Sequence, residues 1–388
     1  MAAIMMFVLK KGSRNSLNNE RESEEFVTNY EGIFGVRFPS MDTVDEVMRK
    51  MNGNCLEKLK IRLVKTLIKK KVFQKSRVFG RYLIAVDGSY VMTVKEGHCE
   101  HCLKRTSQKS GKTTYFHNVV EAKLVTENGF SISLGTEWVE NPGGKYDKQD
   151  CELKAFVRLA EKLKKDFPCL PICISGDGLY PNQTFFRICK ENGWEFIVSF
   201  RDGNLPSVWE EVTELKELAE ENVRQITIFE GEKKTVRRYS WVDDIDYKGF
   251  MLNWSECVEK SAGKTTRFVF VSSLRADYFR VTEITEAGRM RWKIENEGFD
   301  IQKNHGYGLG HKYSRVSVTA TKNYYQCMQI AHIINQLFEL SSLFVPLLKG
   351  RMTVKYLWEY MLGELRHIRL NLRILTALLK RRIQLRYE

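Results

Sequence analysis

The sequence predicts an α/β protein in which helices flank a mixed β-sheet. Between residues 82 and 200, segments of strand type and helix type occur in the order strand, strand, strand, helix, strand, helix, strand. Consecutive strands favour antiparallel pairing, whereas strands that alternate with helices favour parallel pairing, so one sheet is expected to contain both. Helical segments precede and follow this region, and a second group of strand-type segments follows its last strand.

The N-terminal residues 1–78 are expected to be helical and to bind DNA. Leucines recur at helical spacing in "CLEKLKIRLVKTLIKKKVF", at Leu56, Leu59, Leu63 and Leu67. A second stripe of the same helix is basic and consists of Lys58, Arg62, Lys65 and Lys69. Such a stripe is typical of a solvated helix face, and on a basic protein it also suits contact with DNA phosphates.

Residues 79–201 are expected to form the first part of the core. The segments "YLIAVDGSYVMTV", "TTYFHNVVEAKLV" and "GFSISLGTE" are rich in β-branched and aromatic residues and are separated by turn residues, as in antiparallel strands. An amphipathic helix follows in "DKQDCELKAFVRLAEKLKKDF". The chain then gives a buried strand in "LPICISG", a helix in "PNQTFFRICKENG" and a strand in "WEFIVSF".

Residues 202–278 are expected to be a β-rich insertion into this core. A glutamate-rich helix is followed there by four strand-type segments, "VRQITIFE", "TVRRYSWVDDI", "GFMLNWSECVE" and "TRFVFVSS". The core is completed by a helix in residues 279–312, and residues 313–388 form a helical C-terminal region. Near the C-terminus, basic residues are expected on one helix face opposite leucines, at Arg366, Arg369, Arg373 and Lys380.

Composition and charge narrow the class of protein. The chain has 388 residues, 43% of them hydrophobic and 28% charged, which is ordinary for globular domains. The formal net charge of +14 indicates a polyanionic partner such as nucleic acid. Nine cysteines, an odd number in a long chain, favour a reducing cytosol over a disulfide framework. Polar residues interrupt "CMQIAHIINQLFELSSLFVPLL", so a buried helix is expected there and not a membrane span.

Two aspartates end predicted core strands. Asp87 ends the first strand before a Gly-Ser turn, and Asp177 ends the fourth strand between two glycines. Aspartate beside glycine is common in turns, but the carboxyl ends of strands in α/β sheets are also where sites assemble. In a ribonuclease-H-like arrangement the first and fourth strands are adjacent, so the two acids would meet. Clustered carboxylates of this kind bind magnesium.

A third acid is expected in "RMRWKIENEGFDIQK". At about 100° per residue on a helix, Glu295 and Glu297 point about 200° apart, so the two glutamates are not equivalent. Glu295 follows Arg291 by one turn, in the spacing of an ion pair. A surface ion pair and a third active-site carboxylate are both consistent with this spacing.

The segments around these acids resemble a known enzyme family. "VDGS" at Asp87, "GDGLY" at Asp177 and "RWKIEN" at Glu295 look like the three acid blocks of the DDE transposases of bacterial insertion sequences. The resemblance is closest to the branch with a β-rich insertion between the second and third acids. "FGVRFPSMDTVDEVMRKM" also looks like the segment that precedes the catalytic domain in these proteins, so the resemblance covers most of the chain.

The resemblance implies a fold, an activity and partners. The fold would be a ribonuclease-H-like catalytic core with a β-rich insertion and helical N- and C-terminal regions. The activity would be DNA strand cleavage and strand transfer, with Asp87, Asp177 and Glu295 holding two Mg²⁺ ions that Mn²⁺ can replace. Water would first release a 3′-hydroxyl, which would then attack target DNA. The partners would be double-stranded DNA, as terminal inverted repeats and target, and a second copy of the chain, in the bacterial cytoplasm near the nucleoid.

The chain departs from the signature of that branch, Tyr-x2-Arg-x3-Glu-x6-Lys. Arg291 and Glu295 match it, but Gly288 occupies the tyrosine position and Gln302 the lysine position, with Lys303 one residue later. In the family the tyrosine and lysine hold terminal phosphates. Trp292, next to the signature arginine, resembles a position that stacks on a displaced base, and core packing is the equal alternative.

Two other functions remain open at this point, a catalytically silent DNA-binding protein derived from a transposase and a ribonuclease-H-like nuclease without strand transfer. A zinc site is considered in "GHCEHC", which holds His98, Cys99, His101 and Cys102. Structural zinc takes its ligand pairs from two separated segments, and the chain has no second Cys-x-x-Cys, so zinc is disfavoured.

Overall fold

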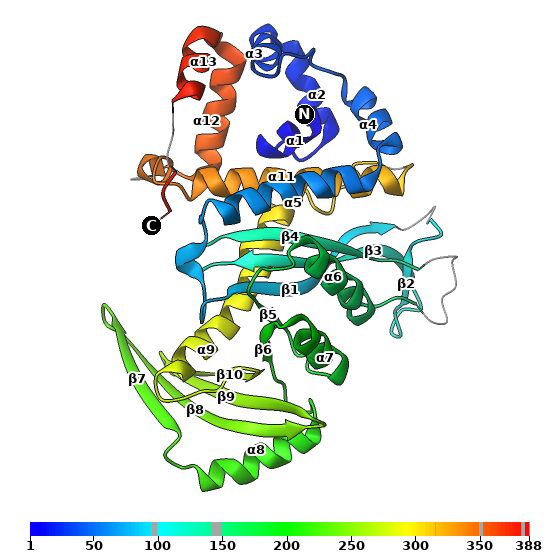
Figure 1. Cartoon of the computed structure of the whole chain (residues 1–388). Coiled ribbons are helices and arrows are strands. Elements are labelled where there is room, and N and C mark those ends of the chain that lie inside the picture. Colours follow the sequence, from blue (N-terminus) through cyan, green and yellow to red (C-terminus); the bar gives the residue numbers. More distant parts are fainter. Residues whose placement is uncertain (95–98, 142–148, 315, 349–351, 382–384, 388) are drawn as a thin grey trace.

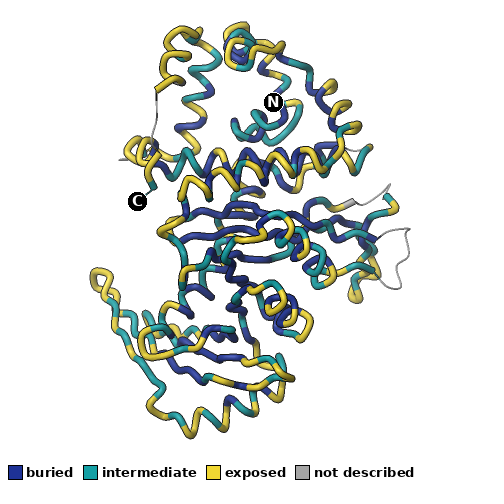
Figure 2. The backbone as a smooth tube through the Cα atoms, in the orientation of Figure 1, coloured by how far each residue is buried: buried dark blue, intermediate teal, exposed yellow. Residues whose placement is uncertain are grey.

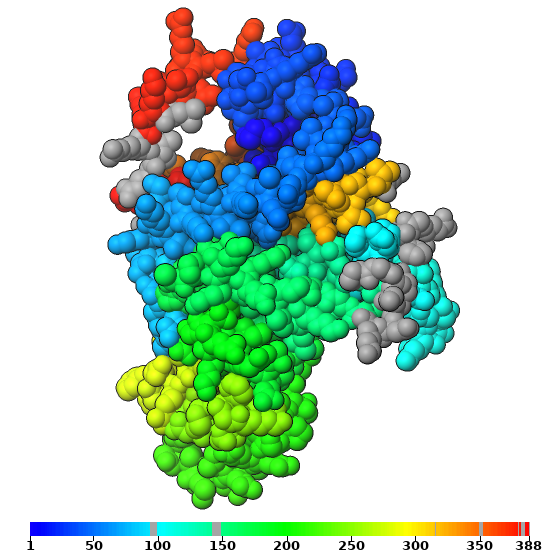
Figure 3. Space-filling view, turned by 45° about the vertical axis from the view of Figure 1, so that its right-hand side comes forward, coloured from blue at the N-terminus to red at the C-terminus, as the bar shows by residue number. Residues whose placement is uncertain are grey.

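A computed structural model describes residues 1–94, 99–141, 149–314, 316–348, 352–381 and 385–387 (Figure 1). These residues form a mixed α/β structure with a ten-stranded sheet, in the order β2-β3-β1-β5-β6-β10-β9-β8-β7, while β4 pairs with β3. Helices flank the sheet, so the predicted fold class is confirmed at this level. Figure 3 places the N- and C-terminal regions together at one end and the β-rich segment at the other.

The N-terminal region is helical, as predicted. It contains α1 (Ala2–Val8), α2 (Arg14–Asn18), η1 (Asn19–Glu22), α3 (Glu24–Phe34), α4 (Met41–Lys50), α5 (Gly53–Lys69) and η2 (Gln74–Ser76). Three of these helices begin after a serine whose side chain accepts a hydrogen bond from a backbone N–H of the first turn, at Ser13, Ser23 and Ser40. These caps explain where the helices start.

The core contains the predicted order of strands and helices, with one additional short strand. Its elements are β1 (Tyr82–Val94), β2 (Leu103–Thr106), β3 (Thr113–Val125), β4 (Ser131–Val139), α6 (Glu152–Asp166), β5 (Ile172–Gly176), α7 (Gln183–Asn192) and β6 (Glu195–Ser199). β3 is antiparallel to β1, β2 and β4, whereas β5 is parallel to β1 and β6. The sheet is therefore mixed, as the order of segments predicted.

The β-rich segment continues the core sheet. It contains α8 (Pro206–Leu218), β7 (Val223–Glu230), β8 (Lys233–Tyr247), β9 (Phe250–Ser261) and β10 (Lys264–Ser272). β7, β8, β9 and β10 form an antiparallel meander, and β10 pairs antiparallel with β6. This pairing joins the four strands to the core edge and fixes where the following helix begins.

The chain then returns to helices. These are α9 (Arg280–Arg289), η4 (Met290–Trp292), the π-helix η5 (Ile294–Asp300), α10 (Ile301–Asn304), α11 (Val318–Glu339), η6 (Val345–Leu348), α12 (Val354–His367) and α13 (Leu372–Lys380). α11 is mostly buried, as its interrupted apolar sequence predicted. Among the described helices, none has the length and apolar character needed to cross a membrane.

The central strands are covered on both faces (Figure 2). On one face, Ile84 and Val86 of β1 belong to the same apolar cluster as Phe156 and Leu159 of α6. On the other face, Leu83 and Ala85 belong to a cluster with residues of α9 and α11. Burial on both faces explains why β1 reads as a nearly continuous apolar run up to Asp87.

The buried face of α5 differs from the predicted leucine stripe. Leu59 is 48% exposed, and Lys60 is completely buried in its place. The ammonium group of Lys60 donates to Ser133 Oγ at 2.8 Å and to Thr136 Oγ1 at 2.9 Å. Hydrogen bonds to β4 therefore set the rotation of the helix, and a count of leucines cannot detect them. The predicted basic stripe is nevertheless exposed, at Lys58, Arg62, Lys65 and Lys69.

The predicted continuous basic face near the C-terminus is wrong, because the helix breaks between α12 and α13. Asn29 of α3 donates to the carbonyl oxygens of Leu365 and Ile368 and accepts from the N–H of Leu370. These bonds replace intrahelical ones, and Asn371 caps the new helix. Arg369 is exposed within the break, and Arg373 is exposed on α13.

Arg366, predicted to bind DNA, is engaged within the protein. Its Nε and Nη2 donate to the two carboxylate oxygens of Glu20 at 2.7 and 2.6 Å. Glu20 is 3% exposed and also pairs with Lys11. Burial acts to raise the pKa of Glu20, but the hydrogen bonds from Arg366 and Lys11 outweigh it and the pKa is lowered. Arg366 therefore joins α12 to the N-terminal helices.

Arg366→Ala should destabilise the protein at neutral pH by about 1.5–3 kcal/mol, because it removes charged hydrogen bonds from a buried carboxylate. A lowered carboxyl pKa stabilises the folded state above the ordinary glutamate pKa, and the effect is lost as the pH falls. The deficit of the variant should therefore shrink in acid. Urea unfolding at two pH values measures it, and Arg369→Ala is the control. A deficit equal in both variants would contradict the role of the ion pair.

Candidate active site

Asp87 and Asp177 lie side by side where the parallel pairing of β1 with β5 ends. The prediction that Asp87 ends its strand before a Gly-Ser turn is wrong, because β1 continues through Gly88 and Ser89 and stays paired with β3, whereas Asp177 does follow the last residue of β5. Ala85 of β1 is paired with Ser175 of β5, and each aspartate is two residues further along its strand. The prediction that the first and fourth long strands are neighbours is thus confirmed. Asp177 accepts a hydrogen bond from the N–H of Leu179 at 2.9 Å, so the turn after β5 fixes this carboxylate.

Glu295 reaches the same place from the helix that follows the β-rich segment. The guanidinium of Arg291 is 5% exposed, and its Nη1 lies 3.1 Å from Glu295 Oε1 and 3.4 Å from Asp87 Oδ2. The predicted pairing of Arg291 with Glu295 is present. Glu297 pairs instead with Lys293 at 3.1 Å. Helical phase therefore separates the two glutamates, and Arg291 joins Glu295 to Asp87.

Glu295 lies in a π-helix and not in a regular α-helix. In a π-helix the hydrogen bonds join residues five apart, and such segments are frequent at functional sites. Ile294 and Phe299, five residues apart, are both buried on the side that faces the sheet. A side chain at Gly298 would lie 3.0 Å from Ser131 Oγ, so the wide turn packs closely on β4. The sequence pattern alone predicted a helix without this distortion.

A fourth carboxylate, Glu152, belongs to the site and was missed by the sequence analysis. It is the first residue of α6. Tyr180, which is fully buried, donates its hydroxyl to Glu152 Oε1 at 2.9 Å. A Cβ at Gly88 would lie 2.6 Å from Glu152 Oε2, so any other residue after Asp87 would displace the Glu152 carboxylate from this position. An acid in the first turn of an amphipathic helix is common, which is why it gave no signal.

Burial, with a contribution from neighbouring carboxylates, raises the pKa of two carboxyls of the site. Burial raises the pKa of Asp87 to about 7; Arg291 acts in the opposite direction, and Glu152 and Glu295 raise it further. Burial also raises the pKa of Glu152, against the hydrogen bond from Tyr180. Two carboxyls with raised pKa values in one place are typical of sites that bind a cation or transfer a proton.

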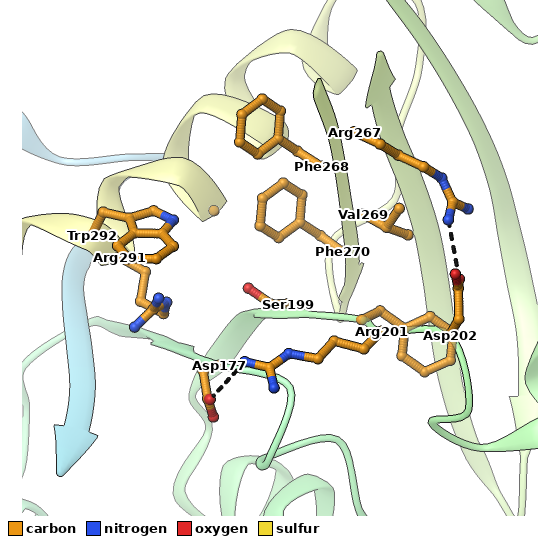
Figure 4. Close-up of a pocket in the computed structure, with 12 residues that line it drawn as sticks. Asp177, Ser199, Arg201, Asp202, Arg267, Phe268, Val269, Phe270, Arg291 and Trp292 are labelled. Atoms are coloured by element: carbon orange, nitrogen blue, oxygen red, sulfur yellow. Dashed lines mark hydrogen bonds and ion pairs between the residues drawn. The ribbon is translucent and has the colours of Figure 1, made fainter. Parts of the chain in front are cut away.

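A pocket of about 500 Å³ opens beside one of these carboxylates, Asp177 (Figure 4). Asp177 lies at one side of it and pairs with the exposed Arg201 at 3.1 Å. Arg291 and Trp292 lie on another side, and the Arg291 guanidinium is 4.6 Å from the centre of the Trp292 ring. Trp292 is 51% exposed, which rules out core packing as its main role.

The two positions that depart from the family signature have structural roles here. A Cβ at Gly288 would lie 2.5 Å from the ring of Phe270, so no larger residue fits without movement of β10. Gln302 is buried and bonds to Gln329 and His332, each at 2.9 Å. Lys303 is exposed, with its Nζ 5.9 Å from the centre of the Phe299 ring. Of Gly288, Gln302 and Lys303, Lys303 is therefore the residue whose side chain can reach a ligand.

The carboxylates are of the type that binds a hard cation, but their oxygens do not lie close enough together to share one. Carboxylate oxygens are the ligands that Mg²⁺ and Mn²⁺ prefer. In the described part of the chain, no three of these carboxylates bring oxygens within 4.8 Å of one another. Arg291 and Arg201 occupy the space between them. Cation binding would therefore require the exposed Arg201 to leave Asp177.

Comparison with known proteins gives no assignment, because no family model and no curated protein matches the chain. The site must therefore be interpreted from its geometry. The arrangement brings together Asp87, Asp177 and Glu295, as predicted, and adds Glu152.

Mn²⁺ should raise the melting temperature more at pH 8 than at pH 6. A raised carboxyl pKa means that the proton, and its contribution to stability, is lost as the pH rises through about 7 at Asp87. Cations bind the ionised form, so their effect should appear over the same range. Because Glu152 raises the pKa of Asp87, Glu152→Gln should move this midpoint to lower pH.

The increase in melting temperature caused by Mn²⁺ can be measured as a function of pH in Asp87→Asn. This variant should show no midpoint near neutral pH. Glu161→Gln is the matched control, since Glu161 is exposed on the same helix as Glu152. Equal midpoints in Glu152→Gln and the wild type would show that Glu152 does not act on Asp87 and is not part of the site.

Proposed function

We propose that the chain is a DDE-type DNA transposase with a ribonuclease-H-like core, which cleaves DNA strands and transfers them to target DNA. The observation that carries this proposal is the convergence of three acids from distant segments. Asp87 and Asp177 lie where the parallel pairing of two adjacent strands ends, and Arg291 holds Glu295 beside Asp87. The acids come in the order and surroundings of the family blocks, which makes coincidence a poor explanation.

The position of the β-rich segment supports the same proposal. β7 to β10 lie between the second acid and the third, as in the branch that the sequence resembles. Because β10 pairs with β6, the segment returns the chain to the core edge, and α9 then leads directly to Arg291 and Glu295. The antiparallel first strands and the parallel β1–β5–β6 group fit a ribonuclease-H-like core.

The donor set fits magnesium or manganese held by Asp87, Asp177 and Glu295, with Glu152 as a further carboxylate. When bound, two such ions activate the attacking oxygen and stabilise the leaving oxygen of a phosphoryl displacement. Burial is the main cause of the raised pKa values of Asp87 and Glu152, and neighbouring carboxylates add to it, so a bound cation would favour the ionised form of both.

The remaining residues position these acids and the DNA. Arg291 reduces the repulsion between Asp87 and Glu295 and orients both. Tyr180 holds Glu152 through its hydroxyl. Arg201, released from Asp177, is placed to contact a phosphate, and the exposed face of Trp292 is placed to stack on an unpaired base at the pocket. Specific DNA ends would thus be held beside the carboxylates.

Substitution of any one acid should abolish strand cleavage, whereas substitution of Glu297 should not. We would incubate the full chain with Mg²⁺ and a plasmid that carries the DNA flanking its gene. Asp87→Asn, Asp177→Asn and Glu295→Gln should each lower the rate at least about 100-fold. Glu297→Gln is the matched control from the same turn of helix, and it should retain the wild-type rate.

Each contrary result has a distinct meaning. Loss of cleavage in Glu297→Gln but not in Glu295→Gln would show that the wrong glutamate was chosen. Wild-type protein that binds the flanking DNA without metal-dependent cleavage would be a catalytically silent DNA-binding protein. Metal-dependent nicking of any DNA, without joining to a target, would identify a nuclease.

The exposed basic face of α5 should contribute to DNA affinity through phosphates. Arg62→Ala and Lys69→Ala should each reduce the slope of log affinity against log salt concentration by about one, without loss of thermal stability. Fluorescence anisotropy with a labelled duplex measures the slope. Lys50→Ala is the control, because Lys50 on the neighbouring helix pairs with Glu46. An unchanged slope in both α5 variants would show that this face is merely solvated.

A further inference from the structure

A second cluster of metal-ligand side chains lies at the edge of the sheet that β2 forms. Cys99 Sγ and Cys102 Sγ are 3.4 Å apart, and His117 Nε2 lies 3.4 Å from the first and 3.2 Å from the second. Within the described ranges, this is the group of cysteine, histidine or acidic side chains whose ligand atoms all lie within 4.8 Å of one another. It shares no residue with the carboxylate site.

The surroundings of the cluster are those of a built site. Cys102 and His117 are buried, and Cys99 is half-buried. Among the described residues, Nδ1 of His117 has no hydrogen-bond partner, and thiols are weak hydrogen-bonding groups. Burial of an imidazole is costly when its partners are this weak. A metal ion bound through Nε2 would replace the weak thiol contacts of that nitrogen, whereas Nδ1 would stay without a partner.

The backbone brings two separate segments together at this cluster. Cys99 and Cys102 belong to a turn in which the N–H of Cys102 donates to the carbonyl oxygen of Cys99 at 3.2 Å. His117 lies on β3, one residue beyond the pair that Phe116 forms with Leu103 of β2. The objection to zinc from the sequence, that a second ligand segment is missing, is therefore answered by a single histidine on a strand. His98 lies outside the described residues.

The distances suit zinc better than a disulfide or a hard cation. Zinc with Zn–S of about 2.3 Å and tetrahedral angles separates two sulfurs by about 3.8 Å and a sulfur from a nitrogen by about 3.6 Å. The observed separations are a few tenths of an ångström shorter, whereas a disulfide would need about 2.05 Å. Sulfur and imidazole ligands select zinc over Mg²⁺.

We propose that Cys99, Cys102 and His117 bind one zinc ion that clamps the β2 edge to β3. Both thiols lose their protons to solvent on binding, and the imidazole binds as the neutral form through Nε2. Three protein ligands leave the fourth tetrahedral position to water or another ligand.

The clamp has a clear structural use. β2 is only four residues long, lies at the end of the sheet and pairs with β3 alone. Short edge strands hold poorly through their own hydrogen bonds. β2 carries the exposed Arg105, and the turn between β2 and β3 carries the exposed Lys109 and Lys112. Zinc would fix this cationic hairpin relative to the sheet.

Metal analysis of the full chain, purified without added metal or chelator, tests the proposal. We expect about one zinc per chain in the wild type and almost none in Cys102→Ser or His117→Ala. Cys169→Ser is the matched control, since Cys169 is an exposed cysteine outside the cluster, and it should retain its zinc. Replacement of zinc by Co²⁺ should give the absorption of tetrahedral, thiolate-bound cobalt, and Cys102→Ser should lose it.

The Co²⁺ spectrum of the wild type keeps the test valid if a variant fails to fold. Wild-type protein that neither contains zinc nor gives the thiolate–cobalt absorption would overturn the proposal. So would a peptide mass lower by two hydrogens in the fragment that contains Cys99 and Cys102, which would indicate a disulfide between them. Zinc that persists unchanged in Cys102→Ser would place the ion elsewhere. None of these outcomes depends on DNA cleavage, so the proposed function is tested separately.

Discussion

The repulsion between neighbouring carboxylates is the constraint on which the candidate active site depends, and Arg291 relieves it. Its buried guanidinium contacts Asp87 of β1 and Glu295 of the π-helix, two residues that the whole β-rich segment separates in sequence. Arg291 therefore holds two negative charges close together and connects β1 to the helix that follows the β-rich segment. Both contacts are made by the same nitrogen, Nη1, so one charged group serves two carboxylates.

A second buried polar group fixes the helices behind the site. Glu121 of β3, which is paired with Asp87 across the strands, accepts hydrogen bonds from Ser133, Thr136 and Tyr325. Lys60 of α5 bonds to the same serine and threonine. α5 and α11 are thus attached to β3 and β4 by charged or polar bonds as well as apolar contact. Such bonds specify one orientation of each helix, because any other orientation would leave a buried charge unpaired.

Sequence patterns predicted those parts of the molecule that depend on local periodicity. The strand that ends before Asp177, the strand that carries Asp87 and the pairing of Glu295 with Arg291 could be predicted from spacing, but not that β1 continues past Asp87 to Val94. Glu152 and His117 could not, because each becomes informative only when folding places it beside residues far away in the chain. The break after α12 and the burial of Lys60 could not be predicted from the sequence for the same reason, because partners on other elements override helical periodicity. The π-helix depends on i,i+5 burial, which a regular 3.6-residue pattern does not detect.

β3 connects the two candidate metal sites and also keeps them apart. Its residue Glu121 lies opposite Asp87, and His117 is four residues earlier, about 13 Å along the strand. One site offers only oxygen ligands and the other only sulfur and nitrogen. The type of ligand would therefore determine which metal each site binds, since magnesium competes poorly for thiolates. A chelator selective for zinc would then loosen the β2 edge while leaving the carboxylates intact, so the two metal ions would have separable roles, one in chemistry and one in holding the edge of the sheet.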